Sequence, residues 1–140
     1  MDILIAETKE QSNDALAVRY KVFVEEQNVP EEEEIDQYEE DAIHFVAYDG
    51  GTPAGAGRIR IQDQTVKVER ICVLNAYRGK KVGQAIMKKI EETSKERGFN
   101  QFLLNAQTHA VPFYKRIGYQ VTSGEFMDAG IPHVQMKKRI

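Results

Sequence analysis

The stretch Val68–Lys89 reads VERICVLNAYRGKKVGQAIMKK, and it predicts how the fold is organised around one loop. Its first residues alternate as in a strand, whereas an apolar stripe at Val82, Ile86 and Ile90 predicts a helix. The residues between them, Arg78 to Lys81, form a basic turn. Cations at a helix N-terminus oppose the helix dipole, by ~0.3–1 kcal/mol each. Either the turn only aids solubility, or it binds an anion, which would account for three cations there.

Composition limits the classes of protein to which the chain can belong. Its 140 residues, 41% of them apolar, are enough for one domain, 1–140, with a real core. No window approaches ~18 uninterrupted apolar residues, and the opening MDILIAETKEQ has no signal-peptide pattern. The single cysteine, Cys72, excludes an internal disulfide and a multi-cysteine metal site. We therefore expect a cytoplasmic protein.

Charge is distributed unevenly along the chain. Residues 25–41, here called the acidic segment, hold ten Asp and Glu and no Lys or Arg, whereas the rest carries 19 bases against 12 acids. A solvated loop is the favoured interpretation of this segment over a metal site, since no calcium-loop pattern occurs in it. An acidic rim for a cationic substrate is the alternative. The scattered bases elsewhere fit a small polyanion better than a nucleic acid.

Periodicity and turn signals predict a mixed sheet with helices packed on its faces, in the α/β or α+β class. The turn Asp49-Gly50-Gly51 indicates a hairpin, and Gly98 and Gly118 are expected to end helices. The expected strands cover roughly 2–8, 44–61 (two strands), 64–73, 99–106 and 133–140, and the expected helices 12–26 (capped by Ser12), 82–97 and 110–118.

The basic turn matches neither of two common nucleotide-binding patterns. A P-loop requires Gly-x-x-x-x-Gly-Lys-Ser/Thr, which is absent, and GAGRIR at Gly55 continues as a strand instead of opening a helix. What remains is a strand, then Arg78 to Gly83, then a helix. Gly79 and Gly83 let the backbone approach a ligand closely, and the helix N-terminus offers N–H groups to a phosphate.

Two segments resemble consecutive motifs of the GNAT N-acetyltransferases. ERICVLNAYRGKKVGQAIM resembles their acetyl-CoA-binding motif, Arg/Gln-x-x-Gly-x-Gly/Ala after a strand, and QTHAVPFYKRIGY is similar to the next motif, with Tyr114 before a Lys-x-x-Gly-Tyr turn. VRYKVFVEEQNV and GIPHVQM further resemble a small bacterial branch related to glucosamine-phosphate acetyltransferases. The sequence departs from the family at Lys81, where glycine is usual, and at Gln107, where asparagine is frequent.

The resemblance implies a single acyl-CoA N-acyltransferase domain with a mixed, mostly antiparallel sheet. It implies transfer of an acetyl group from acetyl-CoA, without a metal, directly to a primary amine. The cofactor-binding residues that it implies are Ile71, Cys72, Val73, Arg78, Gly79, Lys80, Lys81, Val82, Gly83, Gln84, Gln107 and Tyr114.

Two residues are candidates for the chemistry. An amine with a pKa near ~10.4 must lose a proton before it can attack, so a base should face it. Glu69 stands where the family often has a carboxylate; the alternative is a surface glutamate paired with a lysine. Tyr114 matches the family's tyrosine and would stabilise or protonate the departing thiolate; the alternative is an aromatic that fills the core beside Phe113.

The remaining reactive side chains have weaker assignments. A backbone N–H near Val73 is a candidate oxyanion hole. Cys72 is expected to be a buried inert thiol rather than an acetyl carrier. His44, His109 and His133 show no metal spacing, and structural roles are favoured for all three, with an acceptor-pocket role considered for His133.

The sequence does not identify the acceptor. A small-molecule amine is the leading class, with an amino-sugar phosphate such as glucosamine 6-phosphate as one candidate. A non-catalytic acyl-CoA-binding module and a peptide or protein acetyltransferase are the alternatives. We expect acetyl-CoA and an amine as partners, neither nucleic acid nor membrane, and leave a homodimer open.

Overall fold

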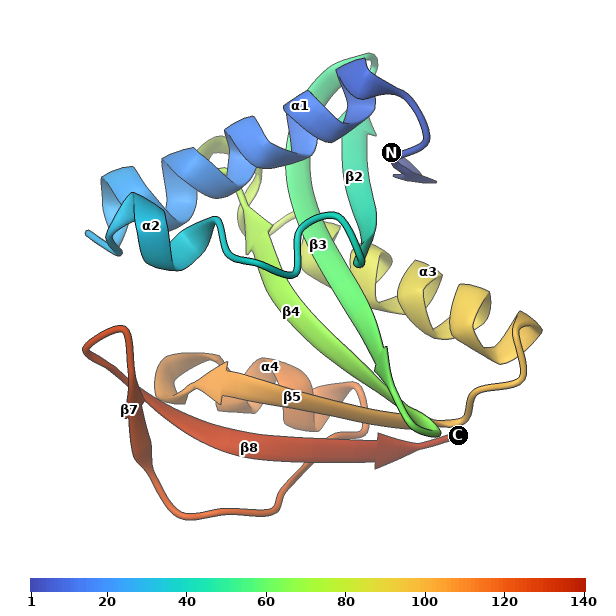
Figure 1. Cartoon of the computed structure of the whole chain (residues 1–140), viewed down its shortest axis with the longest axis vertical. Helices are drawn as coiled ribbons and strands as arrows, with labels where there is room; N and C mark the ends of the chain where they lie inside the picture. Colours follow the sequence, from blue (N-terminus) through green and yellow to red (C-terminus); the bar gives the residue numbers. More distant parts are fainter.

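One mixed sheet runs through the computed structural model, which describes all residues, Met1–Ile140 (Figure 1). Its strands, in the order β1-β2-β3-β4-β5-β8-β6 with β7 beside β8, are β1 (Asp2–Ile5), β2 (Ile43–Asp49), β3 (Thr52–Gln62), β4 (Thr65–Val73), β5 (Gln101–Gln107), β6 (Gln120–Val121), β7 (Phe126–Asp128) and β8 (Ile131–Arg139). Only β4 and β5 pair in parallel. The mixed sheet predicted from the order of elements is confirmed, and so is the mostly antiparallel pairing that the family resemblance implied.

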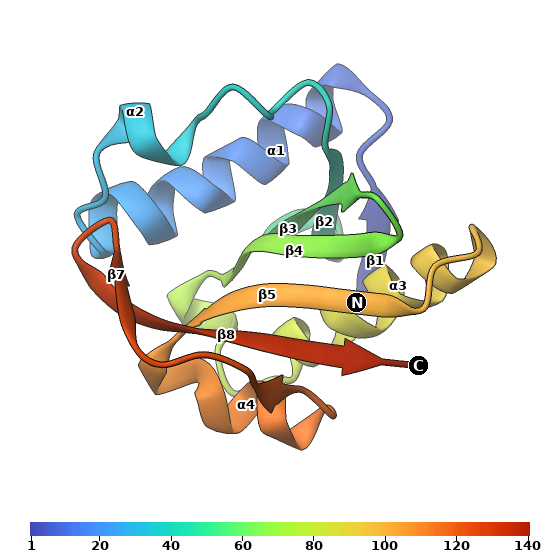
Figure 2. The same ribbon diagram turned by 60° about the horizontal axis from the view of Figure 1, so that its bottom comes forward.

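Helices cover both faces of this sheet. They are α1 (Lys9–Arg19), α2 (Glu31–Glu34), α3 (Val82–Glu96) and α4 (Val111–Arg116), with a π-helical segment at Tyr20–Glu26 and 3₁₀ turns at Asn75–Tyr77 and Thr108–Ala110. Figure 2 shows α1 and α2 on one side of the strands and α3 and α4 on the other. None of these helices combines the length and the apolar composition that a membrane-spanning helix needs.

The central strands bury both of their faces because a helix covers each one. Phe45 and Ala47 of β2 join the larger core against α3, whereas Val46 between them joins a smaller core against α1. The stripe predicted on α3 is buried as expected, with Val82, Ile86 and Ile90 at 2% exposure or less. The same helix ends before Gly98, whose φ of +90° also confirms the predicted stop.

The first helix begins earlier than the sequence indicated, so the assignment of Ser12 as its cap is wrong. Thr8 is the N-cap: its hydroxyl accepts from the Gln11 backbone N–H at 3.1 Å, and the Gln11 side chain accepts in return from the Thr8 N–H at 3.2 Å. Such a capping box satisfies two N–H groups that would otherwise lack partners, and so it outcompetes Ser12. The two short strands β6 and β7 were not predicted, because two and three residues carry no periodic signal.

The acidic segment is where the structure most clearly overturns the sequence-based interpretation. Arg19 and Arg58 are both 0% exposed. Glu34 lies 2.8 Å from the Arg19 guanidinium and Asp36 2.7 Å from that of Arg58, while Glu39 contacts both. The interpretation of the segment as a solvated loop is therefore wrong at these three acids, which pair with buried arginines. A buried guanidinium must be paired, and the segment supplies the carboxylates that pair it.

Candidate active site

The parallel strands β4 and β5 separate halfway along their length. The first pair is Thr65 with Gln101 and the last is Val68 with Leu104. Both strands continue beyond the last pair, β4 to Val73 and β5 to Gln107, without pairing to each other. The edge of β4 that faces β5 therefore has no strand partner beyond Val68. Unpaired backbone N–H and C=O groups on such an edge can pair with an extended ligand.

A β-bulge at Arg70 marks the place of separation. Arg58 of β3 pairs with Glu69 of β4, and Ala56 pairs with Cys72, so Gly57 alone stands opposite Arg70 and Ile71. Arg70 accordingly has a φ of +59°. A bulge bends the strand and increases its twist, and this turns the end of β4 away from β5.

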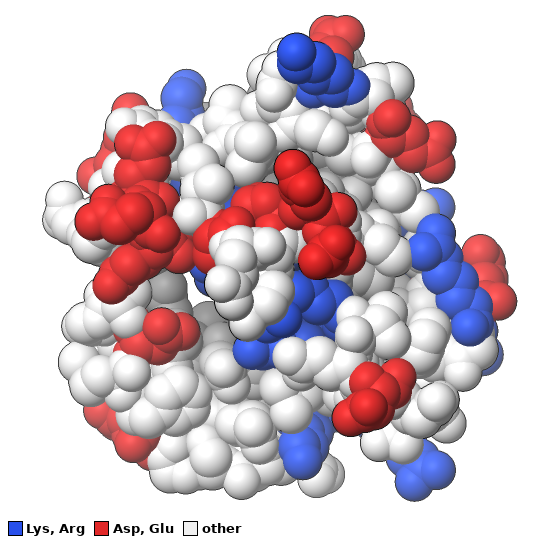
Figure 3. Space-filling model, in the orientation of Figure 1, with Lys and Arg blue, Asp and Glu red and all other residues white.

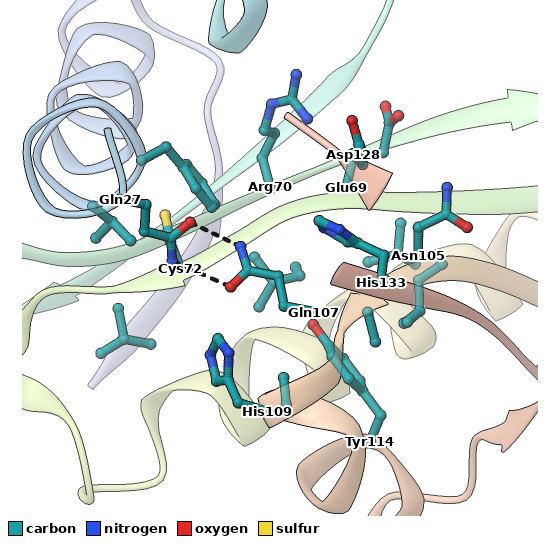
Figure 4. A pocket seen from close by; sticks show the side chains of 18 of the residues that line it. Gln27, Glu69, Arg70, Cys72, Asn105, Gln107, His109, Tyr114, Asp128 and His133 are labelled. Carbon is teal, nitrogen blue, oxygen red and sulfur yellow. Dashed lines mark hydrogen bonds between the residues drawn. The ribbon is translucent and has the colours of Figure 1, made fainter. Parts of the chain in front are cut away.

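The cavity between the separated strands has a volume of about 490 Å³. Figure 4 shows that its polar side chains come from several elements and converge on one space. Among the residues that line it are Glu26, Gln27, Glu69, Arg70, Ile71, Cys72, Val73, Arg78, Asn105, Gln107, His109, Tyr114, Asp128 and His133. Six of the predicted site residues besides Glu69 are thus brought together here: Ile71, Cys72, Val73, Arg78, Gln107 and Tyr114.

The basic turn lies beside this cavity, between β4 and α3. The Arg78 guanidinium donates to the carbonyl oxygen of Val73 at 3.0 Å and to the Glu26 carboxylate at 2.8 Å. Lys81 is the N-cap of α3, and its φ of +64° is one that glycine adopts more easily. The backbone at Lys81 therefore has a conformation that would suit the glycine usual in the family at this position.

Other predicted cofactor residues have different surroundings. Val82 is 2% exposed and packs in the core, so only its backbone is available to a ligand. Gly79, Lys80 and Gly83 lie in the turn and the first turn of α3, beside the cavity but outside its lining. Gln84 is exposed and lines a separate hollow along α3.

Tyr114 lies in the wall of the cavity. Its ring is 8% exposed and packs edge-on against Phe113 and Tyr119, with ring centroids 5.0 and 5.8 Å away. Its hydroxyl has no hydrogen bond to a protein group and points into the cavity (Figure 4). Burial, with a smaller contribution from Cys72, raises the pKa of Tyr114, so the hydroxyl keeps its proton and is a donor.

The thiol and the carboxylate in the lining are both poorly suited to attack a substrate directly. Burial raises the pKa of Cys72 to about 12, so the thiol is protonated near neutral pH. Burial also opposes the charge on Glu69, but the hydrogen bond from Arg60 and the charges of Arg58 and Lys67 outweigh it and lower its pKa. Glu69 is thus ionised but weakly basic.

Two glutamines close one side of the cavity. The amide groups of Gln27 and Gln107 bond to each other in both directions, at 2.8 and 3.4 Å (Figure 4). This pair links the π-helical segment to the end of β5. Gln27 was not predicted as a site residue, and neither were Arg70, Asn105 and Asp128, because no motif marks them and only the fold brings them here.

His133 lines the cavity as well as supporting its own hairpin. Its ring is 8% exposed and stacks on Phe126 with centroids 6.0 Å apart. Its Nδ1 lies 2.7 Å from the carbonyl oxygen of Ile131. His44 is structural, since its Nε2 lies 2.8 Å from the carbonyl oxygen of Glu39. No cluster of three or more His, Cys, Asp or Glu side chains could hold a metal ion.

Comparison with known proteins assigns this site to a family. The model of the acetyltransferase (GNAT) domain matches residues 5–140, and the chain therefore belongs to the GNAT acetyltransferases. It is 55% identical over 139 residues to "Uncharacterized N-acetyltransferase YjcF" of Bacillus subtilis, covering 99% of each chain. The family inferred from the two sequence motifs is confirmed.

Solved structures agree on the fold. The crystal structure of Escherichia coli ElaA is 29% identical, with a TM-score of 0.86 over 99% of this chain and 97% of that one. An aminoglycoside 6'-N-acetyltransferase complexed with coenzyme A has a TM-score of 0.79 over the same shares of the two chains. At 14% identity the second likeness concerns the fold alone.

Proposed function

We propose that this protein is an acetyl-CoA-dependent N-acetyltransferase that acetylates a primary amine of a small molecule. One observation carries the proposal: the unpaired edge of β4 opens onto a 490 Å³ cavity with the basic turn at one end and the Tyr114 hydroxyl in its wall. An extended, anionic thioester matches all three features. Structural neighbours of the same fold are complexed with coenzyme A, which supports this choice of donor.

Each part of the cofactor would meet a matching part of the site. The N–H and C=O groups of Ile71 to Val73 would pair with the amide-bearing arm, as a neighbouring strand would. The basic turn and the N-terminus of α3 would hold the phosphates, with Arg78, Lys80 and Lys81 as cations. A backbone N–H of β4 near Val73 would receive the thioester oxygen as negative charge develops on it.

Tyr114 would act on the sulfur. Because its raised pKa keeps the hydroxyl protonated, it would donate a hydrogen bond or a proton to the departing thiolate. The absence of any protein partner for that hydroxyl supports this role over simple core filling. Glu69 would act as the base only through a water molecule, since Arg58 and Arg60 already occupy its carboxylate.

The acetyl group would pass directly from the thioester to the amine, without an acetyl-cysteine intermediate. With a pKa of about 12, Cys72 holds too little thiolate to accept the acetyl group at neutral pH. The protonated, unpartnered Tyr114 also favours an enzyme over a non-catalytic acyl-CoA-binding module.

Ligand-induced stabilisation tests the proposal at its first step. Acetyl-CoA at 100 times its Kd should stabilise the folded protein by about 2.7 kcal/mol and raise its melting temperature. Arg78→Ala should reduce the shift, whereas Arg139→Ala, an exposed arginine far from the turn, should not. If saturating acetyl-CoA leaves the melting of folded, ligand-free protein unchanged, the proposal is wrong.

A further inference from the structure

A second hollow adjoins the main cavity on the side away from the basic turn. It has a volume of about 330 Å³ and lies between α2, the β7–β8 hairpin and Arg70. Gln27, Gln107 and His133 line both spaces, so the two lie side by side. A molecule in this second hollow would approach the proposed thioester from the side opposite to CoA. We call it the acceptor pocket.

Acidic side chains dominate the lining of the acceptor pocket. Its carboxylates belong to Glu32, Glu33, Glu34, Asp36 and Asp128. Arg19 and Arg70 neutralise Glu34, and Arg58 and Arg70 neutralise Asp36. Arg70 is the only Lys or Arg in the lining, and its guanidinium is already committed to the Glu34 carbonyl as well.

Three carboxylates remain without an ion-pair partner, and they come from opposite sides of the pocket. Glu32 and Glu33 lie on α2, and Asp128 lies at the tip of β7. Figure 3 shows a large group of acidic side chains over α2 and a smaller acidic patch across a hollow from it, toward the β7–β8 hairpin. The hairpin holds Asp128 in place, since Ala129 and Gly130 both have positive φ, as in the tight two-residue turns that join strands.

His133 supplies a second, independent sign of a ligand. The carbonyl oxygen of Ile131 can only accept a hydrogen bond, so His133 Nδ1 donates to it, at 2.7 Å. In the neutral ring Nε2 is then an acceptor, and no protein group donates to it. The His133 ring is only 8% exposed and lines the pocket. A buried acceptor normally has a hydrogen-bond donor, and here a ligand would supply it.

We propose that the acceptor is an amine with a second positive charge, such as a linear α,ω-diamine. This deepens the proposed function and rests on it. The reacting nitrogen lies at His133 Nε2, and the second ammonium lies among Glu32, Glu33 and Asp128. The same charges disfavour an amino-sugar phosphate, whose anion would meet unpaired carboxylates with only Arg70 to offset them.

The transfer balances with these groups. In this pocket the first proton acceptor is His133 and not the water-linked Glu69: its Nε2 takes one proton from the reacting ammonium and passes it to water. The freed lone pair forms the C–N bond to the acetyl carbon, and the C–S bond breaks with its electron pair on sulfur. The second proton that the nitrogen loses ends on the thiolate, through Tyr114 or water, to give the CoA thiol and a neutral amide.

Competing acceptors test the proposal directly. At saturating acetyl-CoA, butane-1,4-diamine should have a kcat/KM about tenfold above that of butylamine and of glucosamine 6-phosphate, because exposed ion pairs are individually weak and several act together here. The triple variant Glu32→Gln, Glu33→Gln, Asp128→Asn should remove most of the diamine's advantage through KM. Glu31→Gln is the matched control, because Glu31 lies on α2 outside the pocket lining.

Two further readouts separate the parts of the proposal. His133→Gln should lower kcat for both amines and spare the diamine's advantage, since it acts on the reacting nitrogen only. Titration calorimetry of the CoA complex with butane-1,4-diamine should show binding that weakens with salt and is lost in the triple variant.

The outcomes distinguish this inference from the proposed function. If amines are acetylated but the triple variant keeps the diamine's advantage, or glucosamine 6-phosphate is preferred, the acceptor assignment is wrong and the acetyltransferase stands. If the CoA complex binds no diamine, the acceptor pocket is likewise refuted. If acetyl-CoA itself does not bind, the failure belongs to the proposed function.

Discussion

Polar groups beneath the acidic segment have partners within the chain, whereas several polar groups around the cavity between β4 and β5 have none. Beneath the acidic segment, Arg19 and Arg58 are buried and each guanidinium has carboxylate partners from the chain itself. Around the cavity, the edge of β4, the Tyr114 hydroxyl and His133 Nε2 are left without protein partners. A polar group whose partners lie within the chain serves folding, whereas one left without partners beside a cavity is available to a ligand.

The largest loss of stability is expected when a buried arginine beneath the acidic segment is removed. Arg58→Ala removes the cation that Asp36, Glu39 and Glu69 share. Each of these acids keeps another arginine, so the loss should lie at or below the about 3–5 kcal/mol that an uncompensated buried charge costs. Urea denaturation should report this loss. Arg139→Ala, which removes an exposed arginine without an ion pair, should stay within about 0.5 kcal/mol of the unmodified protein. A loss below 1 kcal/mol for Arg58→Ala would show that the cluster is not what holds the segment.

The second prediction concerns the cavity. Tyr114→Phe removes one unpartnered hydroxyl and keeps the ring, so stability and acetyl-CoA affinity should barely change. The chemical step should slow by about 10² or less, at the lower end for a general acid because a thiolate needs little proton transfer. Single-turnover acetylation measures it.

Tyr119→Phe is the matched control. It removes a hydroxyl that donates to Glu91 at 3.0 Å, on a ring that packs against Tyr114 but does not line the cavity. It should cost about 0.5–1.5 kcal/mol of stability and leave the rate unchanged. If Tyr114→Phe and the unmodified enzyme have equal single-turnover rates, Tyr114 only fills the core and its proposed role on the thiolate is wrong.

The pairing beneath the acidic segment should also make the stability of the protein depend on pH. Burial opposes the charge of Asp36, but the hydrogen bonds from Arg58 and the Tyr38 N–H outweigh it and lower its pKa to about 2, from an ordinary 3.8. Its contribution is therefore complete above about pH 5 and is lost as the pH falls toward 2. Glu39 and Glu69, whose pKa values are also lowered, act in the same direction. Urea melts between pH 6 and 2 should show this loss, and Arg58→Ala should flatten it; an equally steep profile in the variant would contradict the assignment.

The smallest effect is expected in the basic turn. Lys81 holds a left-handed backbone conformation that costs a side chain roughly 1–2 kcal/mol, so Lys81→Gly should stabilise the protein by about 0.5–1 kcal/mol. It should also weaken acetyl-CoA binding a few-fold at low salt, through the lost charge. Lys80→Gly removes the same charge without relieving a positive φ and should stabilise nothing. If both variants melt alike, the strain at Lys81 is negligible.

Local signals in the sequence determined much of this protein. The stripe at Val82, Ile86 and Ile90, the Asp49-Gly50-Gly51 hairpin and the stop at Gly98 predicted elements that the structure contains, because their physics acts within a few residues. The family could also be inferred from the sequence, because the basic turn and Tyr114 each belong to a short, contiguous motif.

Only the tertiary structure decided which charges and polar groups meet. Arg19 and Glu34 are 15 residues apart and Gln27 and Gln107 are 80 apart, and no local pattern relates either pair. The bulge at Arg70 separates β4 from β5, and only that separation places Asp128 and His133 beside Glu32 and Glu33. Desolvation and long-range pairing are properties of the assembled fold, so the charge of the acidic segment can be read from the sequence but its partners cannot.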